Sequence, residues 1–341
     1  MTKSEIYKTI QDFMSDGTLI VVGSGLSAAE GLPTMQELAC ELECEIPASI
    51  DHSWEQVLQT LRAGKDLESA LSGIQQTDDV LQKIVHTTAR LVRNKEKQIF
   101  EKVICDGYRL PFGRLLEHLF KASRTFHCIT SNYDRIIELA TESVGIGIHN
   151  GFWGTYYGSY DSKRSIDATR TLTKRGRETV QVQSPTLFLH KPHGSLDWYE
   201  VRGKHIKFEG DISLLPLIIT PGVGKYRASL KPVFEEQRTA GNQAIEKAKR
   251  YLVFGYGFND DHLQGYLCPD GGFPKPTIVF SKHLTDSAKG LIVGTSECFA
   301  IGVHAYTADI AKSEILISGQ GSIIVDTPIW NLEVLLQEVL L

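Results

Sequence analysis

Long apolar stretches and an excess of charge of one sign are both missing from this sequence of 341 residues. Apolar runs such as Leu214–Ile219 are far too short to cross a bilayer. The first ten residues, MTKSEIYKTI, contain no apolar signal core. Lys and Arg number 36 against 41 Asp and Glu, so the formal net charge is −5. We therefore expect a cytoplasmic protein that binds neither a membrane nor nucleic acid directly.

Cysteine is sparse and scattered. Only two of the six cysteines are close in sequence, as C-x3-C, and no second cysteine pair or histidine pair lies nearby. Because a tetrahedral zinc site needs four ligands, we expect reduced thiols and no zinc. The six are Cys40, Cys44, Cys105, Cys128, Cys268 and Cys298.

Apolar, β-branched runs alternate with helical patterns through most of the chain. This alternation is typical of an α/β fold with a doubly wound, mostly parallel Rossmann-like sheet. We expect strands at 18–22, 125–130, 186–191, 214–220, 251–254, 277–280, 297–305 and 322–325, a hairpin over 198–208, and a terminal amphipathic helix over 330–341.

The chain between the first two expected strands is helical in character. Apolar residues recur there at i, i+3, i+4 spacing over 54–71, 77–104 and 111–122. We therefore expect one α/β domain over 1–40 and 120–300, a helical insertion over 41–119, and a strand and helix extension over 301–341. Aromatic, glycine-rich residues 147–165 indicate an ordered loop. The basic stretch 163–177 indicates a solvated surface, with a partner or phosphate contact as the alternative.

A glycine-rich segment, GSGLSAAEGLPT over residues 23–34, follows the first expected strand and opens a helix. Glycines let backbone amides approach a pyrophosphate, and a helix N-terminus favours negative charge. The spacing is G-x-G-x5-G, which differs from the dinucleotide fingerprint G-x-G-x-x-G, and the P-loop Gly-Lys-Ser/Thr is absent. A tight turn without a ligand is the alternative reading.

Three further strand ends carry polar side chains or glycines. TSNYD over 130–134 offers an amide and a carboxylate that suit a ribose, or a helix cap. His193 before Gly194 is a candidate general base, or a structural histidine. In GYGFNDDH over 255–262 the glycines would let an adenosine or ribose approach the backbone. The alternative is an ordinary strand–turn–helix in which an Asp caps the helix. Ligands of open α/β sheets bind outside such strand ends, so the four segments predict one dinucleotide site.

Three segments of the chain resemble, in the same order, the three signatures of the sirtuins. They are Gly-Ser-Gly-Leu-Ser-x3-Gly-Leu-Pro, Thr-Ser-Asn-Tyr-Asp and His-Gly-Ser-Leu. The resemblance covers roughly residues 18–300, with the helical stretch as an insertion. Sirtuins cleave the glycosidic bond between nicotinamide and ribose in NAD. The resemblance therefore implies a sirtuin-like domain that takes NAD as substrate.

Site residues carry over position by position. The resemblance implies two catalytic residues, Asn132 facing the nicotinamide ribose and His193 as the base. It also implies ten cofactor-binding residues. These are Gly23, Ser24, Gly25 and Ser27 for the pyrophosphate and nearby ribose, Pro33, Thr34 and Asp134 for the nicotinamide end, and Gly255, Tyr256 and Asn259 for the adenosine half.

The sequence departs from protein deacylases of this family in three places. No cysteine lies between Cys128 and Cys268, where deacylases carry paired C-x-x-C zinc ligands. Thr34-Met35 stands where they usually carry Asp-Phe-Arg, and the Gly255–Phe258 segment also differs. These features resemble the sirtuin-like NAD hydrolases of bacterial anti-phage defence. Those proteins release ADP-ribose and nicotinamide, several act in large assemblies, and some pair with a HerA-type hexameric ATPase.

We therefore expect an NAD glycohydrolase (NADase) that forms a homo-oligomer, with a HerA-type ATPase as candidate partner. Nicotinamide in NAD is already a cationic leaving group, so a positioned nucleophile and local stabilisation suffice. Asn132 would orient the ribose and the attacking water, and His193 would act as base. A zinc-free NAD-dependent protein deacylase and a non-catalytic NAD or ADP-ribose sensor remain alternatives. The long helical gap after the first strand disfavours a dehydrogenase.

Overall fold

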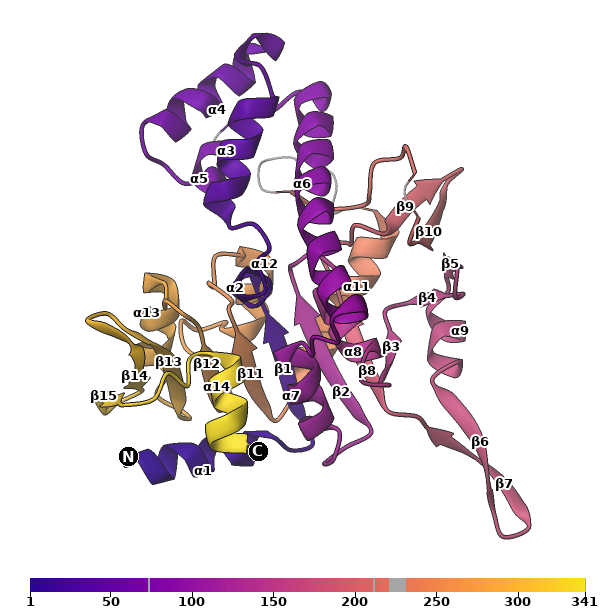
Figure 1. The fold of residues 1–341 in the computed structure, drawn as a ribbon, viewed down its shortest axis with the longest axis vertical. Coiled ribbons are helices and arrows are strands. Elements are labelled where there is room, and N and C mark those ends of the chain that lie inside the picture. Colours follow the sequence, from indigo (N-terminus) through magenta and orange to yellow (C-terminus); the bar gives the residue numbers. More distant parts are fainter. Residues whose placement is uncertain (73, 211, 221–230, 341) are drawn as a thin grey trace.

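The computed structural model describes residues 1–340 apart from 73, 211 and 221–230. A nine-stranded sheet runs through it in the order β15-β14-β13-β12-β11-β1-β2-β8-β3 (Figure 1). Its strands are β1 (Thr18–Val22), β2 (Thr125–Thr130), β3 (Gly147–His149), β8 (Thr186–His190), β11 (Arg250–Phe254), β12 (Thr277–Phe280), β13 (Ala300–Tyr306), β14 (Asp309–Ile317) and β15 (Gly321–Val325).

The chain winds outward from β1 in both directions. It first passes to β2, then to β3 at the edge of the sheet, and comes back to β8 between these two strands. It then returns to β11 on the other side of β1 and continues to β12 and β13. Every pairing from β3 to β13 is parallel, whereas β13, β14 and β15 are antiparallel. The expected α/β, doubly wound, mostly parallel Rossmann-like sheet is confirmed. The reversal of winding at β1 leaves a crevice at the carboxyl ends of its neighbours, where such sheets bind ligands.

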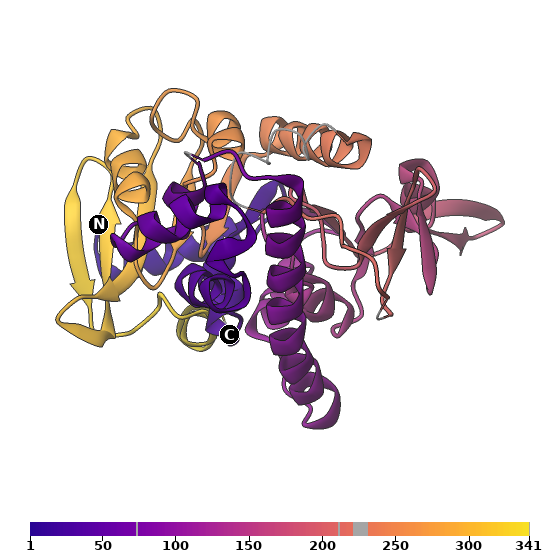
Figure 2. The ribbon, with the colours of Figure 1, turned by 90° about the horizontal axis from the view of Figure 1, so that it is seen from above.

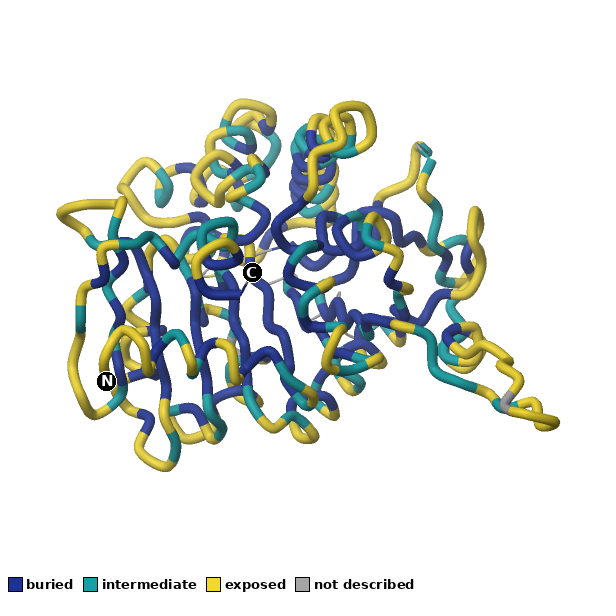
Figure 3. The backbone as a smooth tube through the Cα atoms, turned by 60° about the horizontal axis from the view of Figure 1, so that its bottom comes forward, coloured by how far each residue is buried: buried dark blue, intermediate teal, exposed yellow. Residues whose placement is uncertain are grey.

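Helices cover both faces of this sheet, so central strands such as β1 and β12 are buried on both sides, whereas β3, β14 and β15, at and near the sheet edges, are partly exposed (Figure 3). Successive strand side chains point to opposite faces. In β1, Ile20 and Val22 join the core on one face, and Leu19 and Val21 join the core on the other. The first face is covered by α1 (Lys3–Phe13), α7 (Pro111–Leu119), α8 (Ile136–Glu142), α14 (Leu332–Leu335) and the terminal π-helical turn Leu336–Leu340, and the second by α11 (Pro232–Lys247), α12 (Asp261–Leu267) and α13 (Asp286–Gly294).

The helical segment after β1 contains a core of its own above the sheet (Figures 1 and 2). It comprises α3 (Met35–Glu45), the turn Ala48–Ile50, α4 (His52–Arg62), α5 (Leu67–Ser72) and the first part of α6 (Asp78–Cys105). The 28-residue α6 belongs to two cores. Val80 and Ile84 pack with α3–α5, whereas Val92 and Ile99 pack into the main core. One continuous helix therefore joins the helical segment to the sheet.

A small four-stranded antiparallel sheet and a separate hairpin lie beyond the β3 edge (Figure 1). The sheet runs β4 (Phe152–Trp153), β5 (Tyr157–Tyr160), β10 (Lys204–Phe208) and β9 (Trp198–Val201), and α9 (Ser162–Asp167) follows β5. The hairpin of β6 (Arg170–Arg175) and β7 (Glu178–Gln183) extends away from the body of the molecule. The expected hairpin over 198–208 is thus confirmed.

Several expected elements are wrong in detail. Residues 147–165 hold β3, β4, β5 and the start of α9 rather than a loop. The basic stretch 163–177 forms most of α9 and the first strand of the β6–β7 hairpin, and most of its described residues are exposed, as expected of a solvated surface. In 214–220 only an isolated bridge between Gly194 and Ile218 forms, because Pro216 has no amide hydrogen to donate. The single helix expected over 54–71 is broken by Gly64, which has a φ of +84°. The strand β14 was not expected.

No helix in the described ranges is long and apolar enough to cross a membrane.

Three histidines on β2, β3 and β8, two of them buried and His127 half-buried, predict a loss of stability in acid. Burial lowers the pKa of His127 and His149 to about 4 and of His190 to about 3, and neighbouring cationic groups add to this. In the unfolded chain these groups titrate near pH ~6.5. Between pH about 6.5 and 4 the unfolded state therefore binds more protons, so the free energy of unfolding should fall as pH falls through this window.

Denaturant unfolding at several pH values measures the slope of the unfolding free energy against pH. Glu96 acts in the opposite sense, because burial raises its pKa to about 7. The decisive comparison is therefore between the wild type and His190→Leu, which should reduce the slope by about one proton. An unchanged slope in that variant would contradict the assignment.

Candidate functional site

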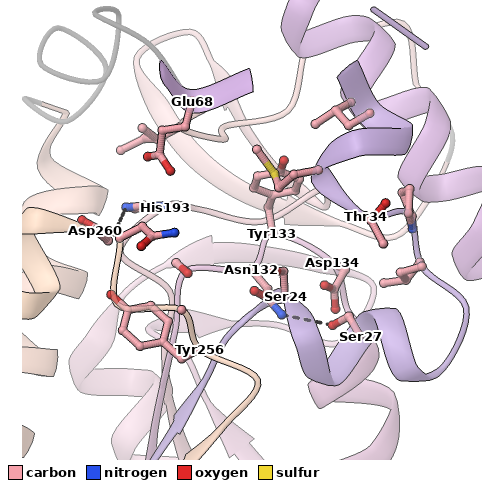
Figure 4. Close-up of a pocket in the computed structure, with 18 residues that line it drawn as sticks. Ser24, Ser27, Thr34, Glu68, Asn132, Tyr133, Asp134, His193, Tyr256 and Asp260 are labelled. Carbon is pink, nitrogen blue, oxygen red and sulfur yellow. Dashed lines mark hydrogen bonds and ion pairs between the residues drawn. The ribbon is translucent and has the colours of Figure 1, made fainter. Parts of the chain in front are cut away.

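A cavity of ≈ 220 Å³ lies at the carboxyl ends of the central parallel strands (Figure 4). Segments following β1, β2, β8 and β11 line it, and the helical segment supplies its opposite side. Nine of the twelve residues expected at the site line this one cavity. They are Ser24, Ser27, Pro33, Thr34, Asn132, Asp134, His193, Tyr256 and Asn259.

The remaining three expected residues, Gly23, Gly25 and Gly255, lie against one another beside the cavity. A Cβ on Gly23 would lie 2.4 Å from the carbonyl oxygen of Gly255, and a Cβ on Gly255 would lie 2.4 Å from the backbone nitrogen of Leu26. The Gly25 N–H donates to the Gly255 carbonyl at 2.9 Å, and the Gly23 N–H donates to Phe254 at 2.9 Å. These glycines pack two loops backbone to backbone. Their contact with a pyrophosphate stays a prediction.

The loop after β2 presents Asn132 and Asp134 to the cavity. Asn132 is only 7% exposed, and its Nδ2 donates to the Gly23 carbonyl and to Ser27 Oγ, both at 3.0 Å. This side chain therefore ties the loop after β2 to α2 (Ser24–Ala29). Burial raises the pKa of Asp134, and the Lys191 ammonium and the Ser27 hydroxyl oppose that shift. The pair offers an oriented amide and a buried carboxyl, both suited to sugar hydroxyls.

A fully buried ammonium lies beneath this loop. Lys191, at the end of β8, donates through Nζ to the Asp134 carbonyl, to Glu138 Oε1 at 2.8 Å and to Ser195 Oγ at 3.1 Å. Burial raises the pKa of Glu138, and Lys191 opposes that shift. Because an unpaired buried charge is costly, Lys191 fixes the loops after β2 and β8 relative to each other.

His193 follows on the same loop and is held by the turn at Gly194. Gly194 has a φ of +81°, and a Cβ there would lie 1.9 Å from the Leu217 carbonyl oxygen. The His193 carbonyl accepts from Ile219 N–H at 2.9 Å. The imidazole Nε2 lies 2.8 Å from Asp260 Oδ2, and the two side chains are 15% and 11% exposed. A partly buried imidazole beside a carboxylate is the arrangement of a general base.

The loop after β11 brings Tyr256, Asn259 and Asp260 to the cavity. Burial raises the pKa of Tyr256, and the Asp260 carboxylate adds to the shift, so the phenol stays a hydrogen-bond donor. The Tyr256 ring packs edge to face on Phe258, with ring centroids 4.8 Å apart. From the sequence, Asp260 was expected only as a possible N-cap of the helix that follows it. Its approach to His193 joins strands on opposite sides of β1 and has no signal in the local sequence.

The helical segment closes the opposite side of the cavity. Met35 and Leu38 of α3 and Glu68 of α5 line it, and Glu68 lies above His193 and Asn132 in Figure 4. Thr34 caps α3 in a capping box with Glu37, so its hydroxyl is already engaged. None of the three lining residues of α3 and α5 was expected at the site, because their contribution depends on how the helices fold back over the sheet.

The helix α6 holds the site loops from behind. Arg93 donates to the Leu196 carbonyl at 2.7 Å, just past His193 and Gly194. Glu96 is fully buried and pairs with Arg135, the residue after Asp134, at 2.8 Å. The helix α6 thus contacts both loops that carry the catalytic candidates. In the part of the chain that the structure describes, no group of three or more His, Cys, Asp or Glu side chains could hold a metal ion.

No protein-family model and no curated protein matches the chain. Among solved structures it is similar to Sir2 proteins. A structure described as the basis for the mechanism and regulation of Sir2 enzymes is 12% identical and covers 85% of this chain and 91% of its own, with a TM-score of 0.43. A Sir2 homologue–NAD complex is 14% identical, with coverages of 85% and 86% and a TM-score of 0.38. Sir2Tm bound to a propionylated peptide is 12% identical, with coverages of 82% and 87% and a TM-score of 0.37.

The close backbone contact at Gly255 predicts that one added methyl group lowers the free energy of unfolding strongly. Gly255→Ala places a Cβ at a φ of +58° and against the backbone of Gly25 and Leu26. We expect a loss of about 2–4 kcal/mol in unfolding free energy, from the left-handed conformation and the overlap together. Gly257→Ala is the matched control, because its Cβ would meet only side-chain atoms at 3.4 Å or more. Equal denaturation midpoints for the two variants would contradict this.

Proposed function

We propose that this chain hydrolyses NAD to ADP-ribose and nicotinamide. The proposal rests on one observation: Asn132 and His193, which come from different strands, line the same cavity at the reversal of strand order. Seven of the expected cofactor-binding residues line it with them. A scattered set of caps and structural histidines would have no reason to converge at one strand edge.

In this proposal the two ends of NAD take different parts of the cavity. The nicotinamide ribose lies by Asn132 and Asp134, whose amide and carboxyl recognise its hydroxyls. The nicotinamide itself lies by Pro33 and Thr34 at the start of α3. The adenosine half lies toward Tyr256 on the loop after β11. The binding of NAD is part of the proposal.

The reaction needs one proton acceptor and no external acid. The oxygen of water bonds to C1′ of the ribose while the bond from C1′ to the nicotinamide nitrogen breaks. The electron pair of that bond neutralises the pyridinium ring, and the water proton passes to His193. Asn132 orients the ribose and the water. Such positioning and proton transfer suffice for a leaving group that is already cationic.

The biological setting follows from the sequence resemblance alone. We propose that hydrolysis depletes NAD in bacterial anti-phage defence, in the cytoplasm. A homo-oligomer and a HerA-type hexameric ATPase are the proposed assembly and partner. Purified protein incubated with NAD, alone and with the product of the adjacent gene, tests both activity and partner.

Removal of either catalytic candidate should abolish turnover. His193→Ala is expected to lower the rate of nicotinamide release by about 10²–10⁴-fold, the usual contribution of a general base. Asn132→Ala is expected to lower it by about 10²-fold, because it removes the group that orients the ribose and the water. Chromatography of the products measures the rate, and circular dichroism shows whether each variant is folded. His283→Ala, an exposed histidine outside the cavity, is the matched control. Full activity in both site variants would refute the assignment.

The same assay separates the alternatives. A zinc-free deacylase would release nicotinamide only when an acylated peptide is added. A sensor would bind NAD or ADP-ribose in calorimetry without forming product. Release of nicotinamide and ADP-ribose from NAD alone is the outcome that supports hydrolysis.

A further inference from the structure

The pair His193–Asp260 lies between two cavities. Both residues, with Ile219, line the main cavity and also a second cavity of ≈ 180 Å³ on the side of α11 and α12. The contact joins the loop after β8 to the loop after β11, which lie on opposite sides of β1 in the sheet. The imidazole is therefore held in place from outside its own loop.

Asp260 is itself fixed by the backbone around it. It is the N-cap of α12, and its Oδ1 accepts from His262 N–H at 3.2 Å, which leaves Oδ2 to face His193. The preceding Phe258 has a φ of 56° and packs on Phe273 with ring centroids 5.5 Å apart. A carboxylate held by a helix cap and a packed turn loses little freedom when it binds the imidazole.

We propose that Asp260 is the positioning residue for His193, an inference that rests on the proposed hydrolysis of NAD. The Asp260 carboxylate accepts a hydrogen bond from Nε2–H of His193. The lone pair of the imidazole is then on Nδ1, which takes the proton of the water. When His193 has taken that proton, the negative charge of Asp260 stabilises the imidazolium. Asp260 does not itself accept the proton.

The position of Asp260 also links the base to the far half of the substrate. Tyr256 and Asn259 line the cavity on the same loop, only a few residues before it. Contacts that the adenosine half makes with this loop therefore order the partner of the base. Binding energy from a non-reacting part of a substrate then appears in kcat rather than in KM alone.

Asp260→Asn tests the charge while it keeps an oxygen for the α12 cap. We expect kcat for NAD to fall about ten- to hundredfold, the value of one charge-assisted hydrogen bond, with KM changed by less than about threefold. Asp161→Asn is the matched control. Asp161 is likewise an N-cap, of α9, and its side chain accepts from Arg164 N–H outside the cavity. It should leave kcat unchanged, and Asp260→Glu should recover part of the loss.

A truncated substrate gives a kcat comparison that would not change if Asp260 had a purely structural role. Nicotinamide mononucleotide keeps the scissile bond but lacks the adenosine half. The wild type should turn it over with a lower kcat than NAD, and Asp260→Asn should shrink that difference. Nitrogen-15 NMR of the ligand-free protein should show His193 protonated on Nε2, and Asp260→Ala should remove that preference.

Outcomes separate the two proposals. Failure of the wild type to release nicotinamide would overturn the proposed function. A wild type that turns over NAD, with Asp260→Asn equally fast, would overturn the role of Asp260 alone. A His193 imidazole protonated on Nδ1 in the wild type would overturn the hydrogen bond on which that role depends, with or without turnover.

Discussion

The close approach of two loop backbones at Gly23, Gly25 and Gly255 is the constraint on which the site depends. Only glycine permits these loops to cross with backbone hydrogen bonds of 2.9 Å between them. Asn132 then completes the arrangement, because its Nδ2 binds the Gly23 carbonyl at 3.0 Å. The segments after β1, β2 and β11 are thereby fixed to one another before any ligand is considered. His193 enters the same group through Asp260 on the loop after β11.

Buried charge holds the other side of the site. Lys191 binds the segment that carries Asp134, and Glu96 of α6 binds Arg135 next to it. Such pairs contribute little net stability, because desolvation offsets their attraction, but breaking one leaves an uncompensated charge. They therefore act as geometric constraints more than as a source of stability. On the sheet side of the cavity, the loops that carry its polar groups are therefore tied to one another and to α6.

The sequence predicts the sheet and most of the cavity lining because both depend on local patterns. Apolar runs such as Thr18–Val22 mark buried strands, and polar residues at their carboxyl ends gather at one sheet edge. The strand β14 was missed because polar residues such as Lys312 and Glu314 interrupt its alternation. Asp260 was missed at the site because its partner His193 is distant in sequence, and Glu68 was missed because it reaches the cavity only when α5 folds back over the sheet. Local pattern shows that a residue is polar and near a strand end, whereas its contacts depend on the whole topology.

The shared helix α6 determines how the helices over the cavity are attached to the sheet. The 28 residues of α6 run unbroken from the α3–α5 core into the main core, so this helix connects the two cores directly. The connection before α3 is different, since Gly31 there has a φ of +102° and empty space around it. The helices over the cavity are thus joined to the sheet by one continuous helix on one side and by the short non-helical residues 31–34 on the other.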